Sequence, residues 1–294
     1  MSETTETTNK YHFVTSFSTR IWEKFAHKAI GTFIEDFKEN GFPDGVESFA
    51  MVLDHQAEVE PFIQSLELPD DKNISGRFKF GSLDTIDKYV GFERQFGDDI
   101  PIKDRGIKLE KLPDGAKFRF NYLPFAKKVF AWCASYLMTP ENEFMVWIDA
   151  DIQLHRRFDK QFLDHIADNF DITFLDRDFP WYAAETGFFI LRRCAAVDQF
   201  VQMVLHAYIS GFIFDMAEWH DGFVFKTFIK FTANVPVRIL NLNVVMRERD
   251  VFERSMLADY MTHYKGGTKQ LLKENQGDFN GNESTLINFD PEDQ

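Results

Sequence analysis

Residues 144–151, with the sequence FMVWIDAD, constrain the fold of this chain more than any other segment. Five apolar residues are followed directly by Asp149 and Asp151, two acids that lie two positions apart. An uninterrupted apolar run is typical of a central strand in an open α/β sheet, and such sheets bind ligands beyond the carboxyl ends of their strands. Both carboxylates can face one metal ion there, and their hard oxygen atoms suit Mg²⁺ or Mn²⁺ held beside substrate phosphates. The segment therefore predicts a metal-dependent enzyme that acts on a diphosphate-bearing substrate.

The chain is strongly acidic, with a net charge of −14 and a pI near 5.0 over 294 residues. Proteins that bind duplex nucleic acid rely on clustered Lys and Arg, so this charge argues against a nucleic-acid partner. It also supports a metal site, because an acidic protein needs a cation between itself and an anionic diphosphate. The sequence has no signal-peptide pattern and no apolar run long enough for a membrane span. We therefore expect a soluble, cytoplasmic protein.

Alternating strand and helix patterns predict a single Rossmann-like α/β domain, with a mostly parallel central sheet flanked by helices. A strand at 11–17, a helix at 21–37 and a strand at 48–53 read as a βαβ unit, in which the two strands are parallel. A helix at 121–138 precedes the acidic strand. Further strands are predicted at 171–175, 187–191, 235–242 and 260–267, and further helices at 158–170, 195–210 and 222–231.

The domain is expected to span residues 11–270. Frequent charges and turn residues weaken the pattern at 58–117, which predicts an insertion or lid there. Residues 1–10 and 271–294 are polar, and they predict a flexible N-terminus and a mobile C-terminal tail.

A second group of reactive residues lies in the sequence THYKGG at 262–267. His263 can give an imidazole nitrogen to a metal ion, and Lys265 can neutralise a phosphate oxygen. Gly266 allows the backbone to approach a phosphate closely, because it has no side chain. The same motif also fits a surface turn with an incidental histidine, so its functional interpretation depends on the aspartate pair.

The chain resembles the nucleotide-sugar glycosyltransferases of the GT-A fold, and among them the glycogenin-like group and related phage and bacterial enzymes. The resemblance rests on the mid-chain strand that ends Asp-X-Asp and on the late His-X-Lys-Gly turn. It implies a GT-A-like domain in which Asp149, Asp151 and His263 hold Mn²⁺ or Mg²⁺. It also implies that Lys265 and Gly266 contact the phosphates of a nucleotide sugar, with a UDP-sugar favoured. The late motif is shorter than the glycogenin-like form, which leaves retention or inversion of configuration open.

Four further residues are candidates for nucleotide binding. Thr15 and Ser16 end the first predicted strand, where the GT-A fold holds the nucleoside, although strand-end capping explains them equally well. Arg119 and Lys128 lie around the start of the helix before the acidic strand, where similar enzymes place a cation near the nucleotide. A solvated helix face explains Lys128 as well.

Two acids are candidates for the catalytic step. Glu185 lies in the segment that lines the sugar and acceptor sites of similar enzymes, and Asp221 precedes a predicted helix, where an N-cap role is the simpler explanation. If the reaction inverts configuration, one of them would deprotonate the acceptor hydroxyl. If it retains configuration, one would stabilise the positive charge at the anomeric carbon. The acceptor is open among glycan, lipid, protein and modified base.

Three other classes of function fit parts of the sequence. A phosphatase of the haloacid-dehalogenase type also has a strand that ends Asp-X-Asp, but it has Thr or Val where this chain has Gln153, and its acidic strand usually lies near the N-terminus. A non-catalytic carbohydrate-binding module would use the acids for a structural ion, which leaves the late His-Lys motif unexplained. A nucleotidyltransferase would need a glycine-rich phosphate loop, which the first strand lacks. The sequence therefore favours a metal-dependent glycosyltransferase.

Overall fold

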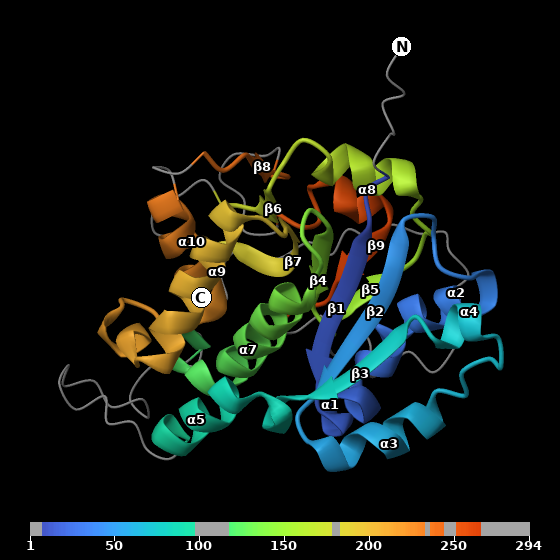
Figure 1. Ribbon diagram of the computed structural model, residues 1–294, viewed down its shortest axis with the longest axis horizontal. Coiled ribbons are helices and arrows are strands. Elements are labelled where there is room, and N and C mark those ends of the chain that lie inside the picture. The colour runs from blue at the N-terminus through green and yellow to red at the C-terminus, as the bar shows by residue number, and fades with distance from the viewer. Residues whose placement is uncertain (1–7, 98–117, 178–182, 233–235, 244–250, 266–294) are drawn as a thin grey trace, which may run out of the picture.

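The computed structural model describes residues 8–97, 118–177, 183–232, 236–243 and 251–265, and a seven-stranded sheet forms its centre (Figure 1). Four of the six neighbouring strand pairs are parallel, and only β7 is antiparallel to its neighbours within this sheet. The predicted α/β fold with a mostly parallel central sheet is confirmed. From edge to edge the strands are β3 (Phe78–Ser82), β2 (Val46–Leu53), β1 (Tyr11–Phe17), β4 (Phe144–Ile148), β7 (Glu185–Arg192), β6 (Ile172–Leu175) and β8 (Ile239–Asn241).

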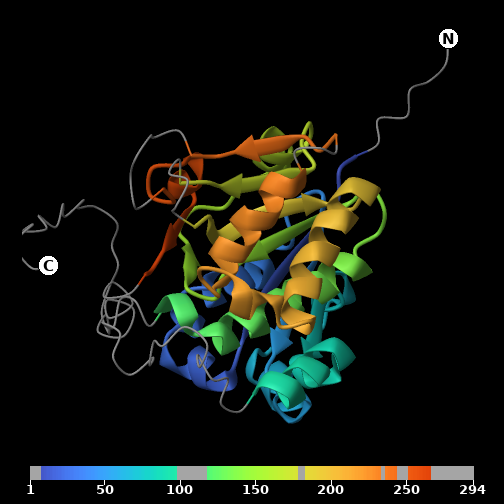
Figure 2. The same ribbon diagram turned by 90° about the vertical axis from the view of Figure 1, so that its left-hand side faces the viewer.

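Helices cover both faces of the sheet, and Figure 2 shows two of them, α9 and α10, side by side in front of the strands. One face packs against α5 (Asp87–Phe96), α7 (Tyr122–Met138), α9 (Ala195–Ile209) and α10 (Asp221–Phe231). The other face packs against α2 (Gly31–Asn40), α3 (Gln56–Ser65) and α8 (Lys160–Ala167). The shorter helices are α1 (Thr19–Lys24) and α4 (Lys72–Ser75), and the 3₁₀ turns are η1 (Ala26–Lys28), η2 (Leu83–Thr85), η5 (Phe118–Phe120), η6 (Phe212–Asp215) and η8 (Met256–Asp259).

Burial on both faces explains the unbroken apolar run of β4, in which all five side chains are buried. On one face Phe13 of β1 stacks against Phe158, with ring centroids 5.4 Å apart. On the other face Trp147 of β4 stacks against Phe189 of β7, with ring centroids 6.2 Å apart. Each large apolar side chain buried in this way contributes about 2 kcal/mol. The two cores therefore fix the position of the strand ends from which the acids emerge.

The single helix predicted at 21–37 is wrong, because the structure has α1 and α2 with a break between them. The break begins at Phe25, whose φ of −161° is not helical. At the start of α2, Gly31 faces Trp22, and a Cβ built on this glycine would lie 3.4 Å from Cη2 of the indole. Apolar residues continue at helical spacing across the break, so periodicity alone does not reveal it.

The described part of the predicted insertion or lid at 58–117 ends at residue 97, so its extent and role remain a prediction. That part contributes to α3, and supplies α4, α5 and β3, an edge strand that pairs in parallel with β2. Only two of the five β3 side chains are buried, and its sequence FKFGS is a weak strand signal. Residues 98–117, 1–7 and 266–294 lie outside the described residues, so the predicted flexible termini remain predictions.

A two-stranded sheet lies beside the main one. β5 (Ile152–Leu154) and β9 (Met261–His263) pair antiparallel, and residue Ile152 lies opposite His263. The pattern at 260–267 predicts the second of these strands, whereas β5 is not predicted from the sequence. None of the described helices is long and apolar enough to cross a membrane.

Candidate functional site

The two acids of the central strand emerge at the carboxyl edge of the main sheet, as predicted. Asp149 follows the last residue of β4, and its backbone N–H donates to the carbonyl oxygen of Gly187 on β7 (2.8 Å). Asp151 leads into β5, whose pairing with β9 brings in His263 from near the end of the described chain. The backbone N–H of Tyr264 donates to the carbonyl oxygen of Asp151 (3.0 Å), which locks the two segments together.

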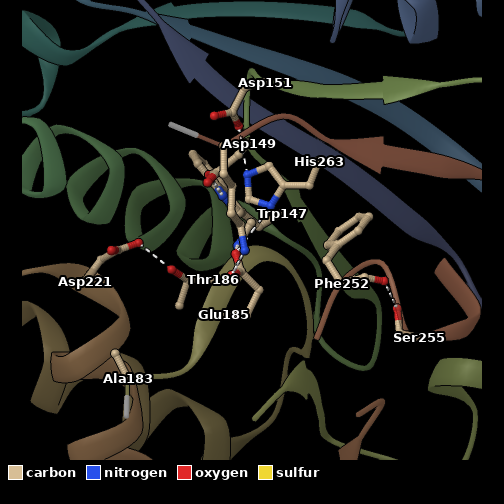
Figure 3. Close-up of polar contacts among 12 residues, drawn as sticks. Trp147, Asp149, Asp151, Ala183, Glu185, Thr186, Asp221, Phe252, Ser255 and His263 are labelled. Atoms are coloured by element: carbon tan, nitrogen blue, oxygen red, sulfur yellow. Dashed lines mark hydrogen bonds and ion pairs between the residues drawn. The ribbon is translucent and has the colours of Figure 1, made fainter. Parts of the chain in front are cut away.

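Asp149, Asp151 and His263 converge at this edge, as Figure 3 shows. One ligand atom from each residue lies within 4.8 Å of the others. The Nε2 atom of His263 is 3.0 Å from Oδ1 of Asp151. Asp151 and His263 are buried, with 9% and 8% of their surfaces exposed. The three residues predicted as metal ligands are therefore brought together.

The imidazole of His263 is held from both sides. Its Nδ1 atom lies 3.4 Å from Oε1 of Glu185, and it makes no hydrogen bond within the described part of the chain. Burial lowers the pKa of His263, but the charges of Asp151 and Glu185 outweigh burial and raise it to about 9. A Cβ added to Gly187 would lie 2.5 Å from Cε1 of the ring, so only glycine leaves room for the imidazole here.

Glu185 is surrounded by positively charged groups. Arg177 donates from Nη2 to Oε2 of this carboxylate (2.5 Å), and the ammonium group of Lys265 pairs with the same oxygen. Oε1 accepts from the backbone N–H of Gly187 (3.1 Å). Burial raises the pKa of Glu185, but His263, Lys265 and Arg177 outweigh burial and hold the pKa well below its usual value. Glu185 is therefore a fixed, ionised carboxylate that contacts His263.

Lys128 of α7 joins Asp149 to Asp221, the first residue of α10. Its Nζ atom lies 2.7 Å from Oδ1 of Asp149 and 2.8 Å from Oδ2 of Asp221. It also donates to the carbonyl oxygen of Thr186 (2.8 Å), and the hydroxyl of Thr186 donates to Asp221 (2.7 Å; Figure 3). Burial lowers the pKa of Lys128, but the two carboxylates outweigh burial and raise it. The indole N–H of Trp147 donates to Asp149 as well (2.7 Å).

A cleft of about 1020 Å³ opens beside the paired acids. The carboxyl end of β1, helix α1, the start of α7 and the end of α5 form its walls. Its volume is large enough for a nucleotide-sized ligand. Its charged lining residues are four cations, Arg20, Lys24, Lys127 and Lys128, and four acids, Asp54, Glu93, Asp149 and Asp151.

Only some of the residues predicted to bind the nucleotide line the cleft. Ser16 and Lys128 line the cleft. Thr15 is fully buried within the sheet and does not line it. Arg119 pairs with Glu218 (3.1 Å) away from the cleft. Lys265 pairs with Glu185, as described above, and Gly266 lies outside the described residues.

Some residues of the site carry no clear signal in the sequence. Arg177 follows the end of β6 and reaches Glu185, and Thr186 joins Lys128 to Asp221. Arg20 and Lys24 line the cleft from α1. Arg20 and Lys24 do have a weak signal in the sequence. Two cations that lie four residues apart, directly after a strand, are on one face of the helix that follows.

The donor set fits a divalent cation. Two carboxylates and one imidazole give fewer ligands than Mg²⁺ or Mn²⁺ requires, so phosphate oxygens and water can complete the coordination. The position of Glu185, 3.4 Å from Nδ1, suits a metal-binding histidine, because a carboxylate on that side of the ring favours a proton on Nδ1 and leaves Nε2 for the metal. Asp149, Asp151 and His263 would hold the ion, and Glu185 would orient the imidazole.

No protein-family model matches the chain, and no curated protein sequence is similar to it. Solved structures that are similar include mouse xyloside xylosyltransferase 1, with 15% identity and a TM-score of 0.45 over 80% of this chain and 85% of that one. A second is a glycosyltransferase involved in glycosylation of the major capsid of PBCV-1, with 11% identity and a TM-score of 0.43 over 90% and 98% of the two chains. A third is an active-site variant of LgtC, with 11% identity and a TM-score of 0.48 over 87% of each chain. These similarities are distant, so the function of this chain has to be derived from its own site.

Proposed function

We propose that this chain is a metal-dependent glycosyltransferase that moves a sugar from a nucleotide-diphosphate donor, with a UDP-sugar favoured, to an acceptor hydroxyl. The observation that carries the proposal is the convergence of Asp149, Asp151 and His263 within 4.8 Å, where both acids line a cleft that also contains four cations. A site of paired acids suits a divalent cation, and the cations that line the cleft beside it suit phosphates. The four cations balance the four acids of the lining, whereas the whole chain carries a net charge of −14.

Some side chains would hold the donor, and others would fix the positions of the metal ligands. A bound Mn²⁺ or Mg²⁺ supplies positive charge that stabilises the nucleoside diphosphate as it leaves. Asp149 and Asp151 would hold that ion against the diphosphate, and His263 would complete the protein ligands. Ser16, at the end of β1, would contact the nucleoside, because it lines the same cleft. Lys128 would keep Asp149 in place through the contact of 2.7 Å.

Glu185 and Asp221 would act as fixed negative charges rather than as general bases. The carboxylate of Glu185 already pairs with Arg177 and Lys265, and that of Asp221 pairs with Lys128. A carboxylate held by cations is a weak base, because its negative charge is already stabilised. Such a carboxylate can still stabilise positive charge that develops near an anomeric carbon. This arrangement favours a retaining reaction, which needs no strong protein base.

Calorimetric titration of UDP and GDP, each with Mn²⁺ and with a chelator, tests the proposal. We expect UDP to bind in the presence of Mn²⁺, and we expect the Asp149→Ala/Asp151→Ala variant to lose this binding. The matched control is Asp44→Ala/Asp70→Ala, which removes two exposed acids that do not line the cleft. Absence of nucleotide binding by the wild-type chain under every metal condition would refute the proposal.

A turnover measurement separates the proposed function from a phosphatase. Mn²⁺-dependent release of UDP from a UDP-sugar, with no phosphate released from simple phosphate esters, is the expected result. Phosphate release from esters without nucleotide binding would favour the phosphatase interpretation instead.

A further inference from the structure

Helix α1 forms one wall of the cleft with two cations. Arg20 and Lys24 lie four residues apart, which places them on the same face of the helix. Both line the cleft that also contains Asp149 and Asp151. The side chains of both are exposed to solvent. Their charges therefore face the same space as the proposed metal ligands.

The other two cations of the cleft already have carboxylate partners. Lys127 lies 2.6 Å from Asp54, and Lys128 lies between Asp149 and Asp221. Arg20 and Lys24 differ, because neither forms an ion pair or a side-chain hydrogen bond with the residues that the structure describes. Two uncompensated positive charges on one wall of a cleft are unexpected in a chain with a net charge of −14. They indicate a ligand that brings its own negative charge.

We infer that Arg20 and Lys24 bind the diphosphate of the donor from the α1 wall of the cleft, an inference that rests on the proposed function. The proposed metal ligands Asp149 and Asp151 are acidic, and the cation beside them, Lys128, is already paired with Asp149 and Asp221. Arg20 can contact phosphate oxygens through two N–H groups, and Lys24 adds a mobile point charge. The two side chains are free to move onto the phosphates once the donor enters, because no partner in the described chain holds them.

The experiment compares two ligands that differ only in the diphosphate. UDP and uridine are titrated into the wild-type chain and into the Arg20→Ala/Lys24→Ala variant, with Mn²⁺ present and at low and high salt. We expect the variant to bind UDP about tenfold more weakly, as the loss of two solvent-screened charge contacts implies. Its affinity for uridine should not change. The difference in UDP affinity should shrink at high salt, because salt screens exposed charges.

Two controls separate this inference from a general effect of charge or folding. The Lys72→Ala/Lys88→Ala variant removes two exposed cations that do not line the cleft, and it should bind UDP like the wild type. Mn²⁺ binding without nucleotide should be the same in all three proteins, because none of these cations contacts Asp149, Asp151 or His263. Unchanged UDP affinity in Arg20→Ala/Lys24→Ala overturns the inference and leaves the proposed function intact. Failure of the wild-type chain to bind UDP with Mn²⁺ overturns both.

Discussion

Replacing Lys128 by methionine removes the positive charge between Asp149 and Asp221 and keeps most of the length of the side chain. The lost contacts are those of 2.7 Å to Asp149, 2.8 Å to Asp221 and 2.8 Å to the carbonyl oxygen of Thr186. Only 13% of the Lys128 side chain is exposed, so water cannot take over the role of the ammonium group. Two acids are then left close together with no cation between them.

The expected loss in the free energy of unfolding is about 3–5 kcal/mol, the range found when one partner of a buried ion pair is removed. A metal ion that binds Asp149 and Asp151 supplies replacement positive charge. Because such an ion binds the folded state, saturating Mn²⁺ should recover part of the loss. The same ion should stabilise the wild-type chain less, since Lys128 already compensates Asp149 there.

Urea unfolding followed by circular dichroism, in a chelator and in Mn²⁺, measures both effects. Lys127→Met is the matched control, because Lys127 is the neighbouring residue on α7 and pairs with Asp54 at 2.6 Å. Its side chain is 32% exposed, so its replacement should cost no more than about 1 kcal/mol. Two results would refute the counterion role of Lys128. One is that Lys128→Met loses no more unfolding free energy than the control, and the other is that Mn²⁺ stabilises the variant and the wild type equally.

Two further predictions concern the packing of the imidazole and the pH dependence of stability. Gly187→Ala should weaken Mn²⁺ binding about tenfold or more in a calorimetric titration. The reason is that the new methyl group would lie 2.5 Å from Cε1 of His263 and displace the ring. Unchanged affinity for Mn²⁺ would contradict this geometry. Burial raises the pKa of Asp171, but Arg238 outweighs burial and lowers this pKa. The ionised carboxylate therefore stabilises the fold at pH values above the usual Asp pKa, and this stabilisation is lost as the pH falls through the lowered pKa. Asp171→Asn should therefore cost about 1–3 kcal/mol at pH 7 and progressively less in acid, as measured by urea unfolding at several pH values; a cost independent of pH would contradict the assignment.

The sequence predicted the parts of this site that follow from local pattern. Asp149 directly follows five apolar residues, and Asp151 lies two positions further on. A buried strand that ends there places both acids at the carboxyl ends of the strands. His263 was identifiable because its neighbours Lys265 and Gly266 form a motif with it. These features depend on residues close together in the chain, so periodicity and spacing are sufficient to find them.

Contacts between distant side chains could not be predicted in this way. Lys128 is predicted to lie near a nucleotide, which remains a prediction, and its ion pairs with Asp149 and Asp221 could not be foreseen, because Asp221 lies far along the chain. Glu185 is predicted to be catalytic, and that role remains a prediction; no local pattern reveals the cations Arg177 and Lys265 that pair with it. Edge strand β3 was missed for a different reason. It is mixed in composition and only two of its five residues are buried, so its pairing with β2 depends on the finished sheet.

The pairing of β5 with β9 also determines when the site can exist during synthesis of the chain. Asp151 and His263 are 112 residues apart in sequence, and the strands β6 and β7 are made between them. The central sheet can begin to form on the ribosome before β9 has emerged, with its acids in place and no imidazole beside them. The three proposed metal ligands therefore come together only after almost the whole described chain has been made. A metal ion held by all three residues would stabilise only a chain that has closed this last pairing.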